Sequence, residues 1–258
     1  MSHSSLENEF IALTKCNRTT ARSYLSRNQW AMDYALNDYY DTEHGTFVEA
    51  TYPPELVAVF KLNQTTNGPW IEPEDFVKFV SESLHYNPED AAVLCLADLL
   101  DLKSFENSIS EEEFLSHWAQ VNCYTLEHMR SHLEACKEKM RTDISYFSRI
   151  YNSAFDLALD RGRKSVSINT AVAYWELLFL STAHYAVKVD PIRIQSWIEF
   201  VSESAVESIT KDAWQQFLVF IIKYPTNELL KSSYNPMAAW PVLIDEYYEH
   251  LEETGLLD

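Results

Sequence analysis

The sequence predicts an all-α fold in which a small three-helix bundle is followed by a larger helical domain. Three observations lead to this prediction. Long stretches carry apolar residues at helical spacing, few stretches alternate apolar with polar residues, and the 258 residues include only four glycines. Because 47% of the residues are hydrophobic and 14% are aromatic, the chain can also fill a large packed core.

The charge balance limits the kinds of partner that the chain can bind. It has 20 basic and 39 acidic residues, a formal net charge of −19. Such a surface repels nucleic acid and anionic membranes, because both carry the same sign of charge. No apolar run approaches the roughly 18 residues of a membrane span. We therefore expect no nucleic-acid or membrane partner, and a basic protein as the natural counterpart.

The cysteines indicate a reducing compartment. None of the four belongs to a C-x-x-C pair, and the first residues lack the basic and then apolar pattern of a signal peptide. We expect the protein in the cytoplasm and the nucleus. The cysteines are Cys16, Cys95, Cys123 and Cys136.

Residues 1–43 predict the three-helix bundle. Leu6 and Phe10 begin an apolar stripe, Thr19 is expected to cap a second helix, and Asn28 is expected to cap a third. Residues 44–54 contain a glycine and two prolines without a helical stripe, so they predict a linker. The larger domain then occupies 55–258.

Two segments near the start of the larger domain resemble EF-hand loops. In Asn63–Glu74, Gly68 stands where the calcium loop bends, but Glu74 is the one carboxylate at a ligand position. In Asp101–Glu112, Glu106 occupies the position that needs glycine. Calcium requires several charged oxygens. We therefore expect EF-hand-like helix pairs that bind no calcium.

The remainder of the chain predicts a succession of helices, and no internal sequence repeat is apparent. A capping box at Ser110 opens one of them, and Asp190 followed by Pro191 opens another. The other predicted helices are Phe76–Leu84, Pro88–Leu102, Leu126–Met140, Ile144–Leu159 and Ser167–Thr182.

The best candidate for a metal site lies in the predicted helix Leu126–Met140. His128, His132 and Cys136 share one predicted helix, but His128 and Cys136 are separated by about 12 Å along its axis. Met129 stands where an H-E-x-x-H motif needs glutamate. The sequence has neither a nucleophile elbow nor a glycine-rich phosphate loop. We expect no catalytic residue, no metal site and no cofactor, with a metal-dependent hydrolase as a remote alternative.

Residues 210–251 predict two helices with a connection between them. Trp214 belongs to an apolar face of the first helix, and Asp212 points away from that face. If the two helices pack side by side, Asp212, Ala239 and Asp245 form an acidic notch with a small apolar floor. The alternative is that Asp212 complements the helix dipole and Asp245 is simply solvated.

Three runs in this half of the chain resemble the defective-in-cullin-neddylation family. They are Ala171–Trp175 (AVAYW), Lys211–Trp214 (KDAW) and Ala239–Asp245 (AWPVLID). The resemblance implies a potentiating-neddylation domain, made of EF-hand-like units without metal, that acts as a scaffold for transfer of a ubiquitin-like modifier to a cullin. It also implies that the family's acidic cullin-binding patch falls on Asp212, Ala239 and Asp245, where a cullin C-terminal domain is expected to bind.

The resemblance implies a second and a third binding site. A hydrophobic groove is expected to take the acetylated N-terminus of the modifier's conjugating enzyme. Residues 1–43 resemble a ubiquitin-associated domain, so Lys15, Cys16 and Asn17 are expected to contact ubiquitin, unless the bundle is a packing module alone. The expected groove residues are Phe76, Val80, Leu94, Leu96, Ala97, Leu100, Ile109, Leu157, Tyr174 and Leu177.

The function expected from these observations is a non-catalytic scaffold for cullin neddylation. One alternative is an EF-hand-like adaptor unrelated to cullins that uses Asn63–Glu74. The other is the metal-dependent hydrolase that would use His128 and His132.

Overall fold

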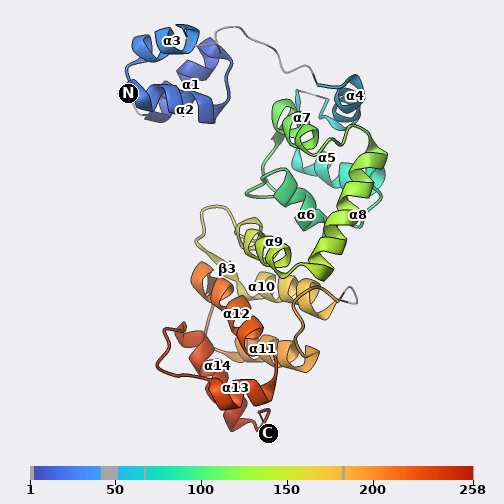
Figure 1. The fold of residues 1–258 in the computed structure, drawn as a ribbon, viewed down its shortest axis with the longest axis vertical. Coiled ribbons are helices and arrows are strands. Elements are labelled where there is room, and N and C mark those ends of the chain that lie inside the picture. Colours follow the sequence, from blue (N-terminus) through green and yellow to red (C-terminus); the bar gives the residue numbers. More distant parts are fainter. Residues whose placement is uncertain (1–2, 42–51, 67, 182–183, 258) are drawn as a thin grey trace. The chain divides into compact units, whose positions relative to one another are not determined.

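The structure, a computed structural model, describes residues 3–41, 52–66, 68–181 and 184–257, and most of these residues are in helices (Figure 1). Four strands of two or three residues each are the other regular elements in these ranges. The all-α prediction is therefore confirmed. The chain divides into two compact units, 1–51 and 52–258. Most of the predicted linker, 44–54, lies outside the described residues.

The first unit is a three-helix bundle with a small aromatic core. Rings of Phe10, Tyr24 and Tyr39 meet there, with centroid distances of 5.7 Å for Phe10 and Tyr39 and 5.1 Å for Tyr24 and Tyr39. Ala21, Leu25 and Ala35 complete the core. The helices are α1 (His3–Thr14), α2 (Arg18–Arg27) and α3 (Met32–Asp41).

The ends of α2 differ from the prediction. Asn17, rather than Thr19, caps its N-terminus, because its side-chain oxygen accepts a hydrogen bond of 2.8 Å from the backbone N–H of Thr20. Asn28 follows the C-terminus of α2, where its amide donates to the carbonyl oxygen of Tyr24 at 2.9 Å. An asparagine side chain can satisfy either end of a helix, so its presence alone does not tell which end it marks.

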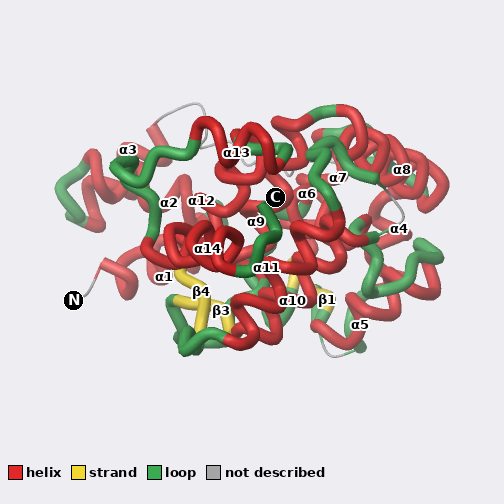
Figure 2. The backbone as a smooth tube through the Cα atoms, turned by 90° about the horizontal axis from the view of Figure 1, so that it is seen from below, coloured by secondary structure: helices red, strands yellow, loops and turns green. Residues whose placement is uncertain are grey.

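The second unit contains four helix–strand–helix segments joined in two pairs, and Figure 2 shows β3 beside β4 in the second pair. In the first pair β1 and β2 are antiparallel with Ile71 opposite Ile109, and in the second β3 and β4 are antiparallel with Val166 opposite Ile209. This is the expected EF-hand-like arrangement. The first pair comprises α4 (Pro54–Asn63), β1 (Trp70–Ile71), α5 (Pro73–Lys78), α6 (Ala92–Leu99), β2 (Ile109–Ser110) and α7 (Glu111–Gln120), and the second α9 (Ile144–Leu157), β3 (Ser165–Ser167), α10 (Ile168–Trp175), α11 (Pro191–Glu203), β4 (Ser208–Thr210) and α12 (Lys211–Lys223).

Further elements connect and extend these pairs. Helix α8 (Leu126–Thr142) lies between them, and two π-helical turns, η2 (Phe79–Ser83) and η3 (Glu176–Leu180), continue α5 and α10. Figure 1 places α4 to α7 toward one end of this unit and α11 to α14 toward the other. The last helices are α13 (Asn227–Ser233) and α14 (Val242–Glu253).

A buried apolar residue and a hydroxyl residue precede the helices that follow three of the strands. Ile109, Val166 and Ile209 are buried in the strands. The next residues, Ser110, Ser167 and Thr210, each accept a hydrogen bond from a backbone N–H of the helix that begins there. Such caps satisfy N–H groups that have no partner within the helix. They hold α7, α10 and α12 in a defined direction relative to the sheets.

Aromatic rings at the centre of the second EF-hand-like pair join α9, α10 and α12. Trp175 stacks on Trp214 at 5.4 Å, and Trp214 stacks on Tyr151 at 4.7 Å. The Tyr151 hydroxyl donates to the backbone oxygen of Trp214 at 3.0 Å and accepts from the indole N–H of Trp175 at 3.0 Å. All three side chains are buried. The polar atoms of these rings are thus satisfied where water is excluded.

Helix α13 was not expected from the sequence. Thr226 caps it by accepting from the backbone N–H of Leu229, and Leu230 is its buried residue. A helix this short and polar shows no apolar stripe, so periodicity does not reveal it. No helix in the described ranges is both long and apolar enough to cross a membrane.

Candidate functional site

Asp212 lies on the first turn of α12 and is exposed to solvent. The side chain of Thr210 caps this helix by accepting from the N–H of Ala213 at 3.2 Å. The neighbouring Lys211 is turned toward α9, where its ammonium is 2.7 Å from a carboxylate oxygen of Asp156. Lys211 is thus paired with Asp156, and the Asp212 carboxylate is exposed at the positive end of the α12 dipole.

Asp245 belongs to α14 and is held by an aromatic side chain. Its carboxylate accepts a hydrogen bond from the hydroxyl of Tyr234, and the ring of Tyr234 stacks on that of Tyr248 at 3.9 Å. Burial, and then the bond to Asp245, raises the pKa of the Tyr234 hydroxyl. Tyr234 therefore keeps its proton and remains a donor to Asp245 at physiological pH.

Ala239 lies in the connection between α13 and α14 and is exposed. The next residue, Trp240, packs against Phe220 at 5.8 Å and against Tyr224 at 6.3 Å, both near the C-terminal end of α12. Ala239 therefore lies near that end, whereas Asp212 is about two helical turns before Phe220. We call Asp212, Ala239 and Asp245 the acidic patch. It extends along helices α12 and α14, which pack against each other.

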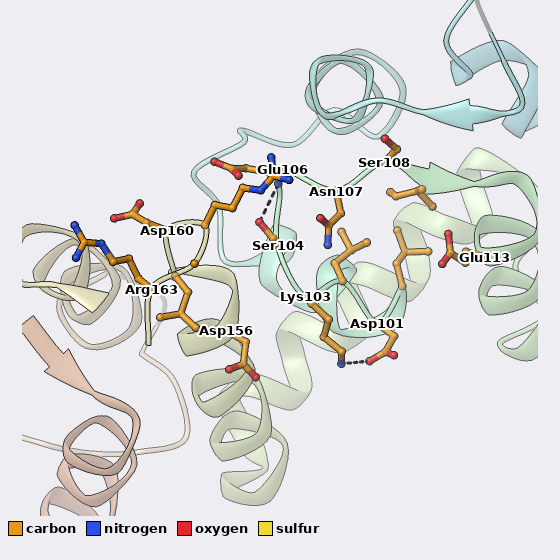
Figure 3. A pocket seen from close by; sticks show the side chains of 16 residues that line it. Asp101, Lys103, Ser104, Glu106, Asn107, Ser108, Glu113, Asp156, Asp160 and Arg163 are labelled. Atoms are coloured by element: carbon orange, nitrogen blue, oxygen red, sulfur yellow. Dashed lines mark hydrogen bonds and ion pairs between the residues drawn. The ribbon is translucent and has the colours of Figure 1, made fainter. Parts of the chain in front are cut away.

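A cavity of about 960 Å³ opens between the loop after α6 and the loop after α9 (Figure 3). Leu100, Leu102, Ile109 and Leu159 give it apolar walls. Charged side chains of both signs surround these walls. They are Asp101, Lys103, Glu106, Glu113, Asp156, Asp160, Arg161 and Arg163. We call this space the loop cavity.

Two of the four apolar walls of the loop cavity were not predicted as site residues. Leu102 and Leu159 were expected to be the last residues of two helices, whereas the structure ends α6 at Leu99 and α9 at Leu157. Leu102 and Leu159 therefore lie in loops and are half-buried. Both stand directly before a charged segment in the sequence. That position is the one feature from which a cavity wall could have been predicted.

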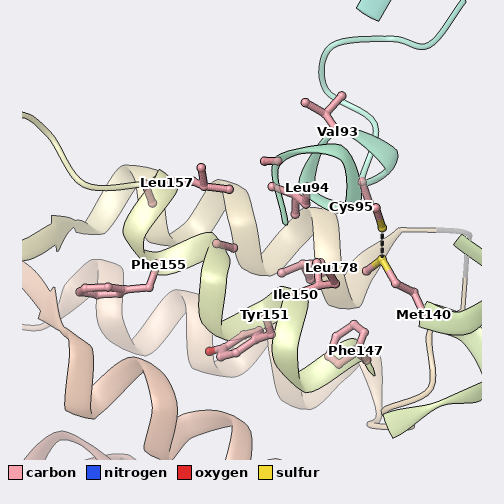
Figure 4. Packing of buried hydrophobic residues seen from close by; sticks show 14 of the residues in the cluster. Val93, Leu94, Cys95, Met140, Phe147, Ile150, Tyr151, Phe155, Leu157 and Leu178 are labelled. Carbon is pink, nitrogen blue, oxygen red and sulfur yellow. Dashed lines mark hydrogen bonds between the residues drawn. The ribbon is translucent and has the colours of Figure 1, made fainter. Parts of the chain in front are cut away.

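The ten predicted groove residues are mostly core residues in this structure. Leu100 and Ile109 line the loop cavity. Tyr174 and Leu177 are half-buried, and the other residues are buried. Figure 4 shows Leu94 of α6 and Leu157 of α9 within the packed core. The remaining buried members are Phe76, Val80, Leu96 and Ala97.

The predicted ubiquitin contacts lie between α1 and α2. Lys15 is exposed with a positive φ of 59°, and Cys16 is half-buried beside Thr14, whose hydroxyl lies 3.1 Å from the Cys16 sulfur. Asn17 is exposed and caps α2. Close to Lys15, Leu13 is exposed and its carbonyl oxygen accepts a hydrogen bond of 3.3 Å from Tyr40 of α3.

The first calcium-like loop uses its side chains within the protein. The Asn63 amide donates to the carbonyl oxygen of Val59 at 2.8 Å, and its oxygen accepts from Ser83 at 2.7 Å. A Cβ on Gly68 would lie 2.3 Å from the Trp70 ring. A close approach of Trp70 is therefore the reason for glycine at this position.

The two histidines of α8 lie in different surroundings. His128 is exposed, whereas His132 is half-buried with its ring 6.4 Å from that of Trp118. Burial lowers the pKa of His132. Cys136 is buried. Across the described part of the chain, no three His, Cys, Asp or Glu side chains are grouped as a metal site would require.

Comparison with known proteins places the chain in a family. A sequence profile described as Cullin binding matches residues 128–250, and one described as UBA-like domain matches residues 6–45. The chain is 40% identical to Defective in cullin neddylation protein 1 of Saccharomyces cerevisiae over 252 residues, which cover 95% of this chain and 92% of that protein. The chain belongs to the defective-in-cullin-neddylation family. The resemblance found in its sequence motifs is thereby confirmed.

Other members of the family show the same relation. Defective in cullin neddylation protein 1 of Eremothecium gossypii is 39% identical over 249 residues, which cover 96% of each chain. Human DCN1-like protein 4 is 31% identical over 186 residues, which cover 72% of this chain and 59% of that protein. The Cullin binding match includes all three residues of the acidic patch, and the UBA-like match covers most of the first unit.

Proposed function

We propose that this protein is a scaffold that promotes cullin neddylation, binding a cullin together with the conjugating enzyme that carries the modifier. The observation that carries the proposal is the 40% identity, over nearly the whole chain, to a relative named for a defect in cullin neddylation. The Cullin binding match to residues 128–250 supports a cullin as the partner of the second unit.

The acidic patch is the proposed cullin site. Asp212 is exposed, Ala239 presents a small side chain, and Asp245 is held in place by Tyr234. Carboxylates arranged in this way suit a basic protein surface, and the net charge of −19 would attract such a surface over a distance.

The loop cavity is the proposed site for the acetylated N-terminus of the conjugating enzyme. Its apolar walls suit a methionine side chain, and burying one contributes about 1.5 to 3 kcal/mol. The cavity also contains two of the predicted groove residues, Leu100 and Ile109. A helix entering there would meet charged side chains of both signs, such as Lys103 and Asp156, at the rim.

The proposed mechanism needs no bond-making group in this chain. Binding both proteins at once turns the encounter between the charged enzyme and the cullin lysine into an intramolecular event. Effective concentrations in the millimolar range are typical of such tethering. Orientation of the reacting groups adds to the rate.

The loop cavity can be tested with Leu159→Arg. The bulky charged side chain would occupy an apolar wall, so we expect affinity for an acetylated N-terminal peptide of the conjugating enzyme to fall at least about 30-fold. Isothermal titration calorimetry measures this directly. Leu62→Arg is the matched control, because Leu62 is 71% exposed on α4 and should tolerate the change. Equal binding by the two variants would place the peptide elsewhere.

We also propose that the first unit binds ubiquitin through the surface of Lys15, Leu13 and Tyr40. Leu13 and Tyr40 are exposed apolar side chains next to the α1–α2 connection. We expect NMR spectra of labelled ubiquitin to shift when the protein is added, and the shifts to be lost with Leu13→Glu. If the unchanged protein causes no shifts at millimolar concentration, the first unit acts as a packing module and this part of the proposal fails.

A further inference from the structure

The solvent-exposed face of α12 carries two large apolar residues beside the acidic patch. Val219 is 47% exposed and Ile222 is 39% exposed. With about 100° of rotation per residue, Val219 lies about 20° and Ile222 about 80° round the helix from Asp212. The opposite side of the helix is buried, through residues such as Trp214 and Phe217. Asp212, Val219 and Ile222 therefore share one face, which we call the α12 stripe.

The exposed parts of these two side chains contribute nothing to the core of this chain. Val and Ile have a lower helix propensity than Gln, Glu or Lys, because branching at Cβ restricts the side chain within a helix. Exposed apolar area also forgoes the gain from burial. Gln215, at a neighbouring exposed position of the same helix, shows the residue type that such a face usually carries.

The α12 stripe continues toward Ala239, another residue of the acidic patch. Lys223 follows Ile222 on α12, and its ammonium lies 5.4 Å from the centre of the Trp240 ring. Trp240 is the residue after Ala239. The exposed face of α12 therefore extends from Asp212 through Val219 and Ile222 to the connection that presents Ala239.

We infer that Val219 and Ile222 form the apolar part of the cullin-binding surface. In the complex they contact an apolar side chain of the cullin, and basic residues of the cullin flank that side chain. The inference rests on the proposed function. Two features indicate this partner. The stripe begins at the exposed carboxylate of Asp212, which calls for a cation, and it adjoins the surface already assigned to a cullin. Apolar centres surrounded by charged residues are the usual organisation of specific interfaces.

The test is the affinity of a purified cullin C-terminal domain for the full chain with Val219→Gln and Ile222→Gln. Glutamine favours helix formation, so α12 should remain folded, and circular dichroism checks this. We expect at least a 10-fold loss of affinity with the same dependence on salt, because no charge has changed. Val77→Gln with Ile144→Gln is the matched control. It changes one Val and one Ile that are each 49% exposed on other helices.

The outcomes separate this inference from the function on which it rests. If the double variant binds as tightly as the parent while changes in the acidic patch weaken binding, the stripe plays no part and the proposed function stands. If the parent binds no cullin, the proposed function and the inference both fail. If the double change alters self-association in sedimentation experiments but leaves cullin affinity unaltered, the stripe contacts a second copy of this chain and the inference is wrong.

Discussion

Replacing the acidic patch with Asp212→Ala, Ala239→Arg and Asp245→Ala is expected to weaken binding of a cullin C-terminal domain at least about 100-fold, or about 2.7 kcal/mol. The two alanines remove the carboxylates that attract a basic surface. The arginine adds a bulky cation at the exposed Ala239, where it repels the same surface. The effect should appear as weaker binding when the cullin domain is titrated and as a lower rate of modifier transfer to the cullin.

The fold should survive this triple change. Asp212 and Ala239 are exposed, and loss of the Asp212 carboxylate from the first turn of α12 costs about 0.3 to 1 kcal/mol. The matched control is Glu127→Ala, Ala135→Arg and Glu138→Ala, because it also replaces two acidic residues by alanine and one alanine by arginine, with the same change of net charge, at exposed positions of α8.

Comparison with this control distinguishes a site from an overall charge effect. If the control lowers affinity as much as the triple change, general electrostatic attraction accounts for binding and the acidic patch is not a site. If neither set of changes matters and the parent binds well, the cullin occupies another surface. Parent binding should also weaken as salt rises, because exposed charges are screened.

Trp214→Ala is expected to lower the free energy of unfolding by about 3 to 5 kcal/mol, the usual cost of truncating a buried tryptophan. Trp214 is fully buried, stacks on Tyr151 and Trp175, and donates from its indole N–H to the Tyr151 carbonyl oxygen at 2.9 Å. Its loss leaves a cavity and removes this hydrogen bond. Urea unfolding followed by far-ultraviolet circular dichroism measures the change.

Trp70→Ala is the comparison for this prediction. Trp70 is 36% exposed at the edge of the two-residue strand β1, so the same truncation there should cost clearly less. A similar loss in the two variants would show that the aromatic cluster around Trp214 does not dominate the stability of the second unit.

The sequence predicted the helices best where a capping residue and an apolar stripe coincide. Helix α8 was expected over Leu126–Met140 and spans Leu126–Thr142, and the capping box expected at Ser110 is present. These signals are local, because a cap and a stripe involve residues within one or two turns. The same locality explains the wrong caps in the first unit, since Asn17 and Asn28 each offer a chemistry that suits either helix end.

Features that depend on residues far apart in the sequence were not predictable in detail. The pairing of Val166 with Ile209 joins strands too short to show alternation. The loop cavity forms where the loops after α6 and α9 meet, and a sequence pattern does not say which loops are neighbours. For the same reason the predicted groove contained true core residues, such as Leu94 and Leu96, alongside Leu100 and Ile109, which do line the cavity.

The hydrogen bond between Tyr234 and Asp245 bears on the entropy of association. A side chain that becomes immobilised in an interface loses about 0.5 to 1.5 kcal/mol of rotameric freedom. Asp245 is already restrained by Tyr234, whose ring is in turn held against Tyr248, whereas Asp212 is exposed to solvent. Folding has therefore already ordered one carboxylate of the acidic patch, and an incoming cation that meets Asp245 finds its counter-charge preorganised.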